Sequence, residues 1–490
     1  MKPLGTITTC FPHVDDETRI ILQSIMNKAE NYSDFVIRFC EKACSKQSSQ
    51  LIRYLAYFHA FHIDMYPEMD RIIKSDDMPV YYEPLHLVSR VKVGETVDMN
   101  MMYKSLIKAM NEIPNDWLAC HLYLEWRRAA ESFYPETDTD KQIMETLEKR
   151  IKNDDDFACF KPLFIGLEAY GMMMKGYHED ALQTYERGLA LARKYDDLPL
   201  IADGLCLIAE TIRIMDAPRA IEIMQEHNKI AEELGYKWGL ARNSLILGWI
   251  MLYRGEFNAA LNHLLEFREL VDSIGHPSAW SEFVLALIYN LVGDGENAIE
   301  YLNSIKDKVD DRKRNAALYY LMFAFAYIKI GNKREASAYL DTAKQLVVRA
   351  GFQSYLNWHQ LLEGIFEKEQ GDFESAMDTF DNLLNRLNKM EDLHRILCLF
   401  HLAEIEVETQ SPETEDIAES FLNRFETYVE EKDYPGFIAQ AKILRVKLLQ
   451  KQGEHKKAQA LVDAVLQVAE SPSMAYLKDM IAVHVPSAGC

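Results

Sequence analysis

The sequence predicts an all-α protein, an α-α superhelix in which helical hairpins follow one another along the chain. Three observations support this fold class. Only 21 Gly and 15 Pro occur in 490 residues, which favours long helices over short strands with tight turns. A glycine followed five residues later by an alanine recurs along the chain, and apolar residues at helical intervals flank the recurrences.

The glycine and alanine pairs mark turns between helices. Six pairs share the offset of five: Gly176 with Ala181, Gly255 with Ala260, Gly293 with Ala298, Gly331 with Ala336, Gly371 with Ala376, and Gly453 with Ala458. Glycine can adopt the left-handed conformation that ends a helix, and a small alanine lets two helices of a hairpin approach closely. Each pair therefore predicts the turn and the second helix of one hairpin.

The spacing of these turns gives the period of the repeat. The chain advances 38 residues from 255 to 293, 38 from 293 to 331, and 40 from 331 to 371. Two longer gaps are each filled by a degenerate unit, one with Met215 before Ala220 and one with the turn QSPETED before Ala418. We therefore predict about eight units between residues 157 and 470.

Two short signatures within these units identify a family resemblance. The first helix carries Leu247-Gly248, Leu285-Ala286 with Tyr289, and Phe323-Ala324 with Tyr327; the second carries Ala181 with Tyr185 and Ala376 with Phe380. This pattern resembles the tetratricopeptide repeat (TPR), and implies a right-handed solenoid of tandem TPR-like hairpins. The longer period and the missing closing proline are similar to the long-helix variant in sensor domains of signalling-ATPase transcription regulators.

The resemblance divides the chain into three expected parts. Residues 116–473 form the TPR-like array, with clear units from 157, and residues 474–490 form a frayed C-terminal tail. Residues 1–115 show no repeat, and we expect their helices to close the N-terminal end of the solenoid. Within this region we predict one long helix over 16–43 and another over 48–66, the latter capped by Ser48 or Ser49.

Composition excludes several classes of partner. The formal charge of −22 disfavours direct binding to nucleic acid and to an anionic membrane surface, because both need clustered cations. The N-terminus has no apolar core of signal-peptide length, and no uncharged apolar run is long enough to span a bilayer. We therefore expect a cytoplasmic protein.

Candidate catalytic and metal-binding motifs are weak. His59, His62 and Asp64 are close in sequence, but no further ligand motif accompanies them, and histidines packed within an aromatic run explain them better than a metal site does. The sequence contains no Gly-Lys-Ser phosphate loop, no G-x-S-x-G elbow and no H-E-x-x-H motif. We expect no catalytic, cofactor-binding or metal-binding residues, and hence not an enzyme.

The family resemblance implies a partner site on the concave face of the array. The small residues Gly248, Ala286, Ala324 and Gly364 set the register of the inner helices. The side chains that this register places in the groove are Arg242, Trp249, Tyr253, Trp280, Asn290, Phe325, Lys329, Trp358 and Lys368. Cations and aromatic rings together would suit a peptide with acidic and apolar groups. Alternatively, the aromatic residues pack between helices and the cations are simply solvated.

Three functions are compatible with these features. The first is a non-catalytic scaffold or adaptor that binds a protein or peptide in the concave groove. The second is a ligand-sensing regulatory module, related to the sensor half of transcription regulators. The third is an enzyme with a site in the N-terminal region. The sequence does not identify the partner, the pathway or the oligomeric state.

Overall fold

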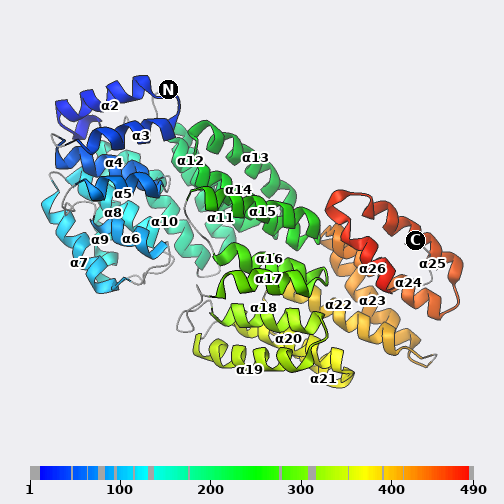
Figure 1. The fold of residues 1–490 in the computed structure, drawn as a ribbon. Helices are drawn as coiled ribbons and strands as arrows, with labels where there is room; N and C mark the ends of the chain where they lie inside the picture. Colours follow the sequence, from blue (N-terminus) through cyan, green and yellow to red (C-terminus); the bar gives the residue numbers. More distant parts are fainter. Residues whose placement is uncertain are drawn as a thin grey trace. The chain divides into compact units, whose positions relative to one another are not determined.

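The structure, a computed structural model, is helical throughout its described part (Figure 1). It describes residues 11–45, 48–62, 65–75, 83–92, 97–113, 116–130, 137–174, 177–274, 279–306, 316–350, 353–388, 391–411 and 413–484. No strand occurs in these ranges, so the predicted all-α class is confirmed. None of the helices in these ranges is both long and apolar enough to cross a membrane.

The chain forms two compact units. Unit 1 comprises residues 1–246 and 269–277, and unit 2 comprises residues 247–268 and 278–490. Helix α14 (Lys237–Tyr253) and helix α15 (Phe257–Ser273) each contribute residues to both units.

The helices of unit 1 begin with a non-repetitive region and continue as hairpins. They are α2 (Asp16–Lys28), α3 (Tyr32–Ala43), α4 (Gln50–His62), α5 (Tyr66–Lys74), α6 (Glu83–Lys92), α7 (Met99–Glu112), α8 (Asp116–Ala130), α9 (Asp138–Asn153), α10 (Lys161–Met174), α11 (His178–Lys194), α12 (Leu198–Ile212) and α13 (Ala217–Leu234). Short 3₁₀ helices lie at Phe11–His13 and Asp155–Phe160.

Unit 2 consists of hairpins followed by one last helix. Its helices are α16 (Ala279–Leu291), α17 (Gly295–Ser304), α18 (Ala316–Lys329), α19 (Lys333–Ala350), α20 (Gln353–Gln370), α21 (Phe373–Leu384), α22 (Asp392–Thr409), α23 (Glu415–Glu431), α24 (Pro435–Lys451), α25 (His455–Ala469) and α26 (Tyr476–His484). A 3₁₀ turn at Pro472–Met474 precedes α26.

The predicted hairpins are present. Helices α10 and α11, α12 and α13, and the five pairs from α16 to α25 pack as consecutive partners. Five of the six predicted turn glycines have positive φ, from 72° at Gly331 to 89° at Gly293, while Gly176 lies outside the described residues. The alanines five residues after these glycines are at most 2% exposed. Local backbone freedom and close helix packing therefore set the repeat, as predicted.

The first helices of successive pairs in unit 2 form an inner layer. Helix α16 contacts α18, α18 contacts α20, α20 contacts α22, and α22 contacts α24. A first helix that touches both its hairpin partner and the neighbouring first helices can bury most of its surface. Helix α18 is the clearest case, with eleven buried residues in AALYYLMFAFAYIK.

The N-terminal region has an aromatic core. Phe35, Phe39, Tyr54 and Tyr57 are all fully buried there. His59 is 1% exposed, and its Nδ1 lies 2.7 Å from the Tyr32 hydroxyl oxygen. His59 therefore packs among aromatic residues, which is one of the two interpretations that the sequence allowed. The His62 side chain and Asp64 lie outside the described residues.

The prediction of a single helix over residues 16–43 is wrong, because two helices occupy this range. Helix α2 ends where Ala29 takes an extended conformation, and Asn31 begins α3 by accepting a hydrogen bond from the Asp34 amide at 2.9 Å. An asparagine side chain that caps a new helix competes with helix continuation, and the continuous amphipathic pattern concealed this. The predicted helix start at Ser49 is correct, since the Ile52 amide donates to its hydroxyl at 3.3 Å.

The expectation of a frayed tail after 474 is also wrong for the described residues. Residues 476–484 form α26, in which Leu477 and Ile481 are at most 1% exposed. These two residues are four positions apart, so they lie on one helical face and bury it against α24 and α25. A helix of nine residues is too short to be recognised from propensity alone, and tertiary packing stabilises it.

Helix α26 also takes part in a contact that joins distant parts of unit 2. The Tyr476 hydroxyl donates to the Gly255 carbonyl at 2.9 Å, and the Gly436 amide donates to the Arg254 carbonyl at 3.0 Å. A Cβ at Gly436 would lie 2.0 Å from the Gly255 oxygen, so only glycine permits this approach. The turn before α15 is thereby fixed to α24 and α26.

Candidate functional site

The inner layer of unit 2 surrounds a hollow of about 520 Å³. Helices α16, α18, α20, α22, α24 and α26 and the start of α15 contribute to it. Its apolar wall includes Phe257, Phe325, Leu397, Phe400, Phe437, Met480 and Val483. Its polar side chains are Lys329, Lys368, Glu369, His401, Glu404, Gln440 and Asp479. The volume lies within the range of pockets that hold small molecules or a few peptide side chains.

Three buried polar side chains of the hollow form one network. Lys368 Nζ donates to Glu404 Oε2 at 2.5 Å, and His401 Nδ1 lies 3.1 Å from the same oxygen. Burial opposes the charge on Lys368 and Glu404, but each group offsets this for the other. The pKa of Lys368 is therefore raised, and the pKa of Glu404 is held well below its usual range. Burial lowers the pKa of His401 to about 4, so its imidazole is neutral at pH 7.

Lys329 differs from Lys368 in having no such partner. Its ammonium lies 5.5 Å from the centre of the Phe325 ring, and no carboxylate of the described residues is within ion-pair distance of it. Burial, followed by the positive charge of Lys368, lowers the pKa of Lys329 below its ordinary value. The hollow thus contains a half-buried cation that has no direct ion-pair partner among the described residues. An anionic group entering the hollow would supply the missing partner.

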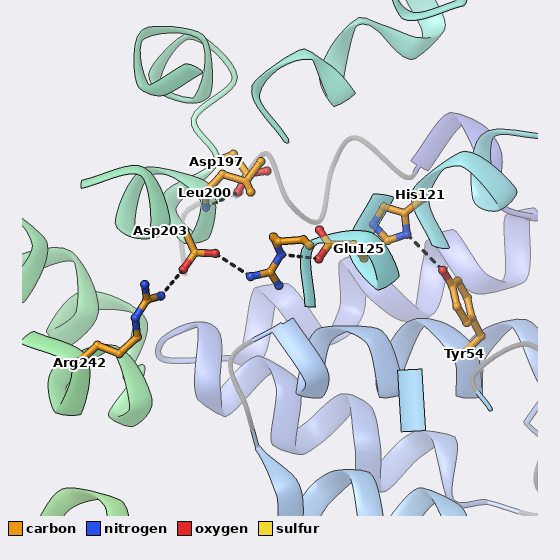
Figure 2. Close-up of polar contacts among 8 residues, drawn as sticks. Tyr54, His121, Glu125, Asp197, Leu200, Asp203 and Arg242 are labelled. Carbon is orange, nitrogen blue, oxygen red and sulfur yellow. Dashed lines mark hydrogen bonds and ion pairs between the residues drawn. The ribbon is translucent and has the colours of Figure 1, made fainter. Parts of the chain in front are cut away.

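The structure brings together three of the residues expected in the groove. Phe325, Lys329 and Lys368 all line the hollow. Arg242 lies in unit 1, where its Nη1 donates to Asp203 Oδ1 at 3.0 Å (Figure 2). It lines a separate cavity in that unit.

The other expected groove residues are placed differently. Trp249 and Tyr253 are half-buried on α14 with their ring centres 6.2 Å apart, and neither lines the hollow. Asn290 is fully buried and donates to the Met322 carbonyl at 3.2 Å, which ties α16 to α18. Trp358 packs on His394 with a ring separation of 4.5 Å. The Trp280 side chain lies outside the described residues.

Sequence reasoning missed the acidic member of the network. Glu404 lies 36 residues after Lys368, close to one repeat period, so the two occupy similar positions on successive first helices. Opposite charges one period apart on apolar helices are the signal that could have identified the pair. The aromatic residues Phe257 and Phe437 were missed because they come from elements about 180 residues apart, which the contact at Gly255 brings together.

Comparison with known proteins identifies the fold but no close relative. No protein-family model matches the sequence, and no curated protein matches it. Among solved structures, a Rap protein complexed with competence and sporulation factor is similar to this chain with 13% identity and a TM-score of 0.52. That match covers 72% of this chain and 97% of the Rap chain.

Two further structures match with lower scores. The Rap conjugation gene regulator of plasmid pLS20, in complex with the Phr* peptide, has 14% identity and a TM-score of 0.47 over 72% of this chain and 94% of its own. Yeast Tom70 has 13% identity and a TM-score of 0.36 over 93% of this chain and 92% of its own. The match to the first Rap protein, at a TM-score of 0.52, and the consecutive packed hairpins show a helical-repeat fold of the tetratricopeptide type.

Proposed function

We propose that this chain is a non-catalytic scaffold or adaptor that binds a protein or peptide segment in the hollow of unit 2, and that it acts in the cytoplasm. The observation that supports the proposal most directly is the half-buried ammonium of Lys329, which lines the hollow and has no carboxylate of the described residues within ion-pair distance. Leaving a cation in that state lowers stability, and a ligand anion would offset this cost.

The chemistry of the hollow suggests the composition of the segment. An Asp or Glu side chain, or a terminal carboxylate, would accept a charge-assisted hydrogen bond from Lys329. Apolar side chains would pack against Phe325, Phe400 and Phe437. Glu369 and Asp479 also line the hollow, and they disfavour segments with several acidic residues. We therefore propose a mainly apolar segment with one acidic group.

The structural neighbours are compatible with this proposal. The Rap protein was solved with competence and sporulation factor bound. A likeness at 13% identity shows the fold alone, so the choice of ligand rests on the residues of this chain.

The test is a selection from a random peptide library with the purified full-length protein. Selected peptides should contain one Asp or Glu among apolar residues. Lys329→Glu should weaken their binding at least tenfold, because a charge-assisted hydrogen bond contributes about 1.5 to 3 kcal/mol and a repulsion replaces it. Isothermal titration calorimetry measures the change.

The matched control is Lys333→Glu, which makes the same charge change at an exposed residue outside the hollow. It should bind the selected peptides as the wild-type protein does. If Lys329→Glu binds them as tightly as Lys333→Glu, the hollow is not the binding surface and the proposal is wrong.

A ligand-sensing regulatory module is the second candidate function. The observation that favours it is a cavity of about 210 Å³ within unit 1, which is too small for a peptide but large enough for a small molecule. A rise in melting temperature with a small ligand, and none with selected peptides, would favour this candidate over the scaffold. Among the described residues, no observation favours the third expectation, an enzyme site in residues 1–115.

A further inference from the structure

The cavity in unit 1 lies between helices of the first hairpins. Helices α8, α10, α11, α12 and α14 line it, and its volume is about 210 Å³. An apolar cavity of about 150 Å³ can hold a benzene molecule, so this space is large enough for a ring or a short branched chain with a small polar head.

Three glycines leave this space open. Gly166, Gly188 and Gly204 lie within α10, α11 and α12, and all three line the cavity. Glycine within a helix costs about 1 kcal/mol relative to alanine, so each needs a reason. Close packing explains Gly364 of unit 2, where a Cβ would lie 2.7 Å from the Phe380 ring.

Close packing does not explain the glycines of the cavity. A Cβ at Gly188 or Gly204 would lie no closer than 3.4 Å to any neighbour, and a Cβ at Gly166 would meet nothing within 4 Å. Alanine would fit at all three positions without displacing a neighbour. The absence of a side chain at these three positions adds to the empty volume of the cavity.

Three charged side chains in the cavity wall, Arg128, Asp203 and Arg242, are bonded to one another, and Figure 2 shows the contact between Asp203 and Arg242. Arg128 Nη1 donates to Asp203 Oδ2 at 2.9 Å, and Arg242 Nη1 donates to Asp203 Oδ1 at 3.0 Å. Arg128 Nε donates to Glu125 Oε2 at 2.9 Å, but Glu125 does not line this cavity. Two carboxylates, Asp203 and Glu125, therefore pair with the two guanidinium groups, so a ligand would have to use the donors that these carboxylates leave.

The two guanidinium groups retain donors that could serve a ligand. A guanidinium has five N–H groups. Within the described part of the chain, only the Nη1 of Arg242 and the Nε and Nη1 of Arg128 have acceptors. The side chains of both arginines are 23% exposed, so neither is fully enclosed by its carboxylate partners. A single ligand carboxylate could accept charge-assisted hydrogen bonds from the remaining N–H groups of the two arginines.

We propose that the cavity of unit 1 binds a small monocarboxylate whose apolar body is an aromatic ring or a short branched chain. The body occupies the volume that Gly166, Gly188 and Gly204 leave open. The carboxylate accepts hydrogen bonds from Arg242 and Arg128. This site is in unit 1 and does not depend on peptide binding in the hollow of unit 2.

The test is binding of phenylacetate and 4-methylpentanoate to the purified full-length protein, measured by calorimetry and ligand-observed NMR. At least one should bind in the micromolar to low millimolar range. The neutral analogue phenylacetamide should bind at least tenfold more weakly than phenylacetate. Failure of both carboxylates to bind at 10 mM, or equal binding of the amide, would overturn the proposal.

Two variants locate the ligand. Gly166→Leu should abolish binding, because its side chain fills open space in the cavity and leucine also favours the helix. Its matched control is Gly171→Leu on the same helix, where a Cβ also meets nothing within 4 Å but which does not line the cavity. That control should bind as the wild type does. Equal binding by Gly166→Leu and Gly171→Leu would overturn the proposal.

Arg242→Gln tests the polar end. Asp203 keeps Arg128 as its partner in this variant, so the fold is retained, and circular dichroism confirms this. Phenylacetate should bind at least tenfold more weakly, whereas the exposed-residue control Lys237→Gln on the same helix should leave binding unchanged. Unchanged binding by Arg242→Gln would show that the arginine does not hold the carboxylate.

Discussion

The hollow of unit 2 and the cavity of unit 1 each have two cations beside apolar walls. The two sites differ in how these cations are paired with carboxylates. In unit 1, Arg128 and Arg242 share the Asp203 carboxylate. In unit 2, Lys368 is paired with Glu404, while no described carboxylate lies within ion-pair distance of Lys329. The difference distinguishes cations that are paired within the fold from one, Lys329, that has no carboxylate partner among the described residues.

The use of arginine in unit 1 and lysine in unit 2 agrees with this difference in pairing. A guanidinium keeps its charge and can bond to several acceptors at once, so Arg128 and Arg242 can bond to Asp203 and still offer donors. An ammonium is a point charge whose pKa falls readily when it is desolvated, as the pKa of Lys329 does. Removing Lys329 should therefore leave the stability unchanged or raise it, whereas removing Arg242 should lower it.

The largest expected effect is the loss of the acidic partner in the hollow. Glu404→Ala leaves Lys368 buried without its main partner, so the free energy of unfolding should fall by about 3 to 5 kcal/mol. Glu369→Ala is the control, because Glu369 also pairs with Lys368, at 3.3 Å, but is 48% exposed. That change should cost less than about 1 kcal/mol. Urea unfolding gives both values, and equal losses would contradict the assignment.

The next effect is a dependence of stability on pH. Burial lowers the pKa of His401 from 6.5 to about 4, so the unfolded chain binds more protons than the folded chain between these values. Stability should therefore fall as the pH drops from 6.5 towards 4. One pKa unit corresponds to about 1.36 kcal/mol, so His401→Gln should reduce the loss between pH 6.5 and 4.5 by about 2 to 3 kcal/mol.

The control for this titration is His455→Gln at an exposed position. It should leave the pH dependence of unfolding as it is in the wild type. If the free energy of unfolding of both variants changes with pH as it does in the wild type, burial does not hold His401 neutral.

A smaller effect should follow from blocking the contact between α24 and the turn before α15. Gly436→Ala places a Cβ 2.0 Å from the Gly255 oxygen and should cost about 1 to 3 kcal/mol. Hydrogen exchange should increase in α24, α26 and residues 254–258. Gly171→Ala, at a helical glycine with open space around it, should instead stabilise the protein by up to about 1 kcal/mol. Unchanged exchange in Gly436→Ala would show that the contact does not form.

The smallest expected effect is the change in stability of Lys329→Met, which we compare with that of Arg242→Met. Lys329→Met removes a desolvated charge without a carboxylate partner and should leave stability unchanged or raise it by about 1 kcal/mol. Arg242→Met removes one of the two donors to Asp203 and should lower stability by about 1 to 3 kcal/mol. Thermal unfolding distinguishes the signs. A loss of stability in Lys329→Met as large as that in Arg242→Met would remove the distinction between the sites.

Local features of the fold could be predicted from the sequence. The offset between Gly255 and Ala260 identified the turn, because a left-handed residue and a small buried residue are both local requirements. The break at Ala29 could not be predicted from the amphipathic pattern, which continues through it. Helix α26 depends on burial of Leu477 and Ile481, which is a property of tertiary packing.

The candidate site could be predicted only in part. The register of the first helices indicated Phe325, Lys329 and Lys368, which line the hollow. It also indicated Asn290, which the structure shows to be buried and bonded to the next helix. A small rotation of a helix separates a groove residue from an interior one, and residue spacing does not determine that rotation.

The central claim is that Lys329 is kept without a carboxylate partner so that a ligand anion can bind to it. The most direct test is the pKa of Lys329, measured by NMR of the dimethylated lysine in the free protein and in complex with a selected acidic peptide. The free protein should give a pKa below the ordinary value of 10.5, and the complex should give a higher value. An ordinary pKa that does not change when the peptide binds would contradict the account.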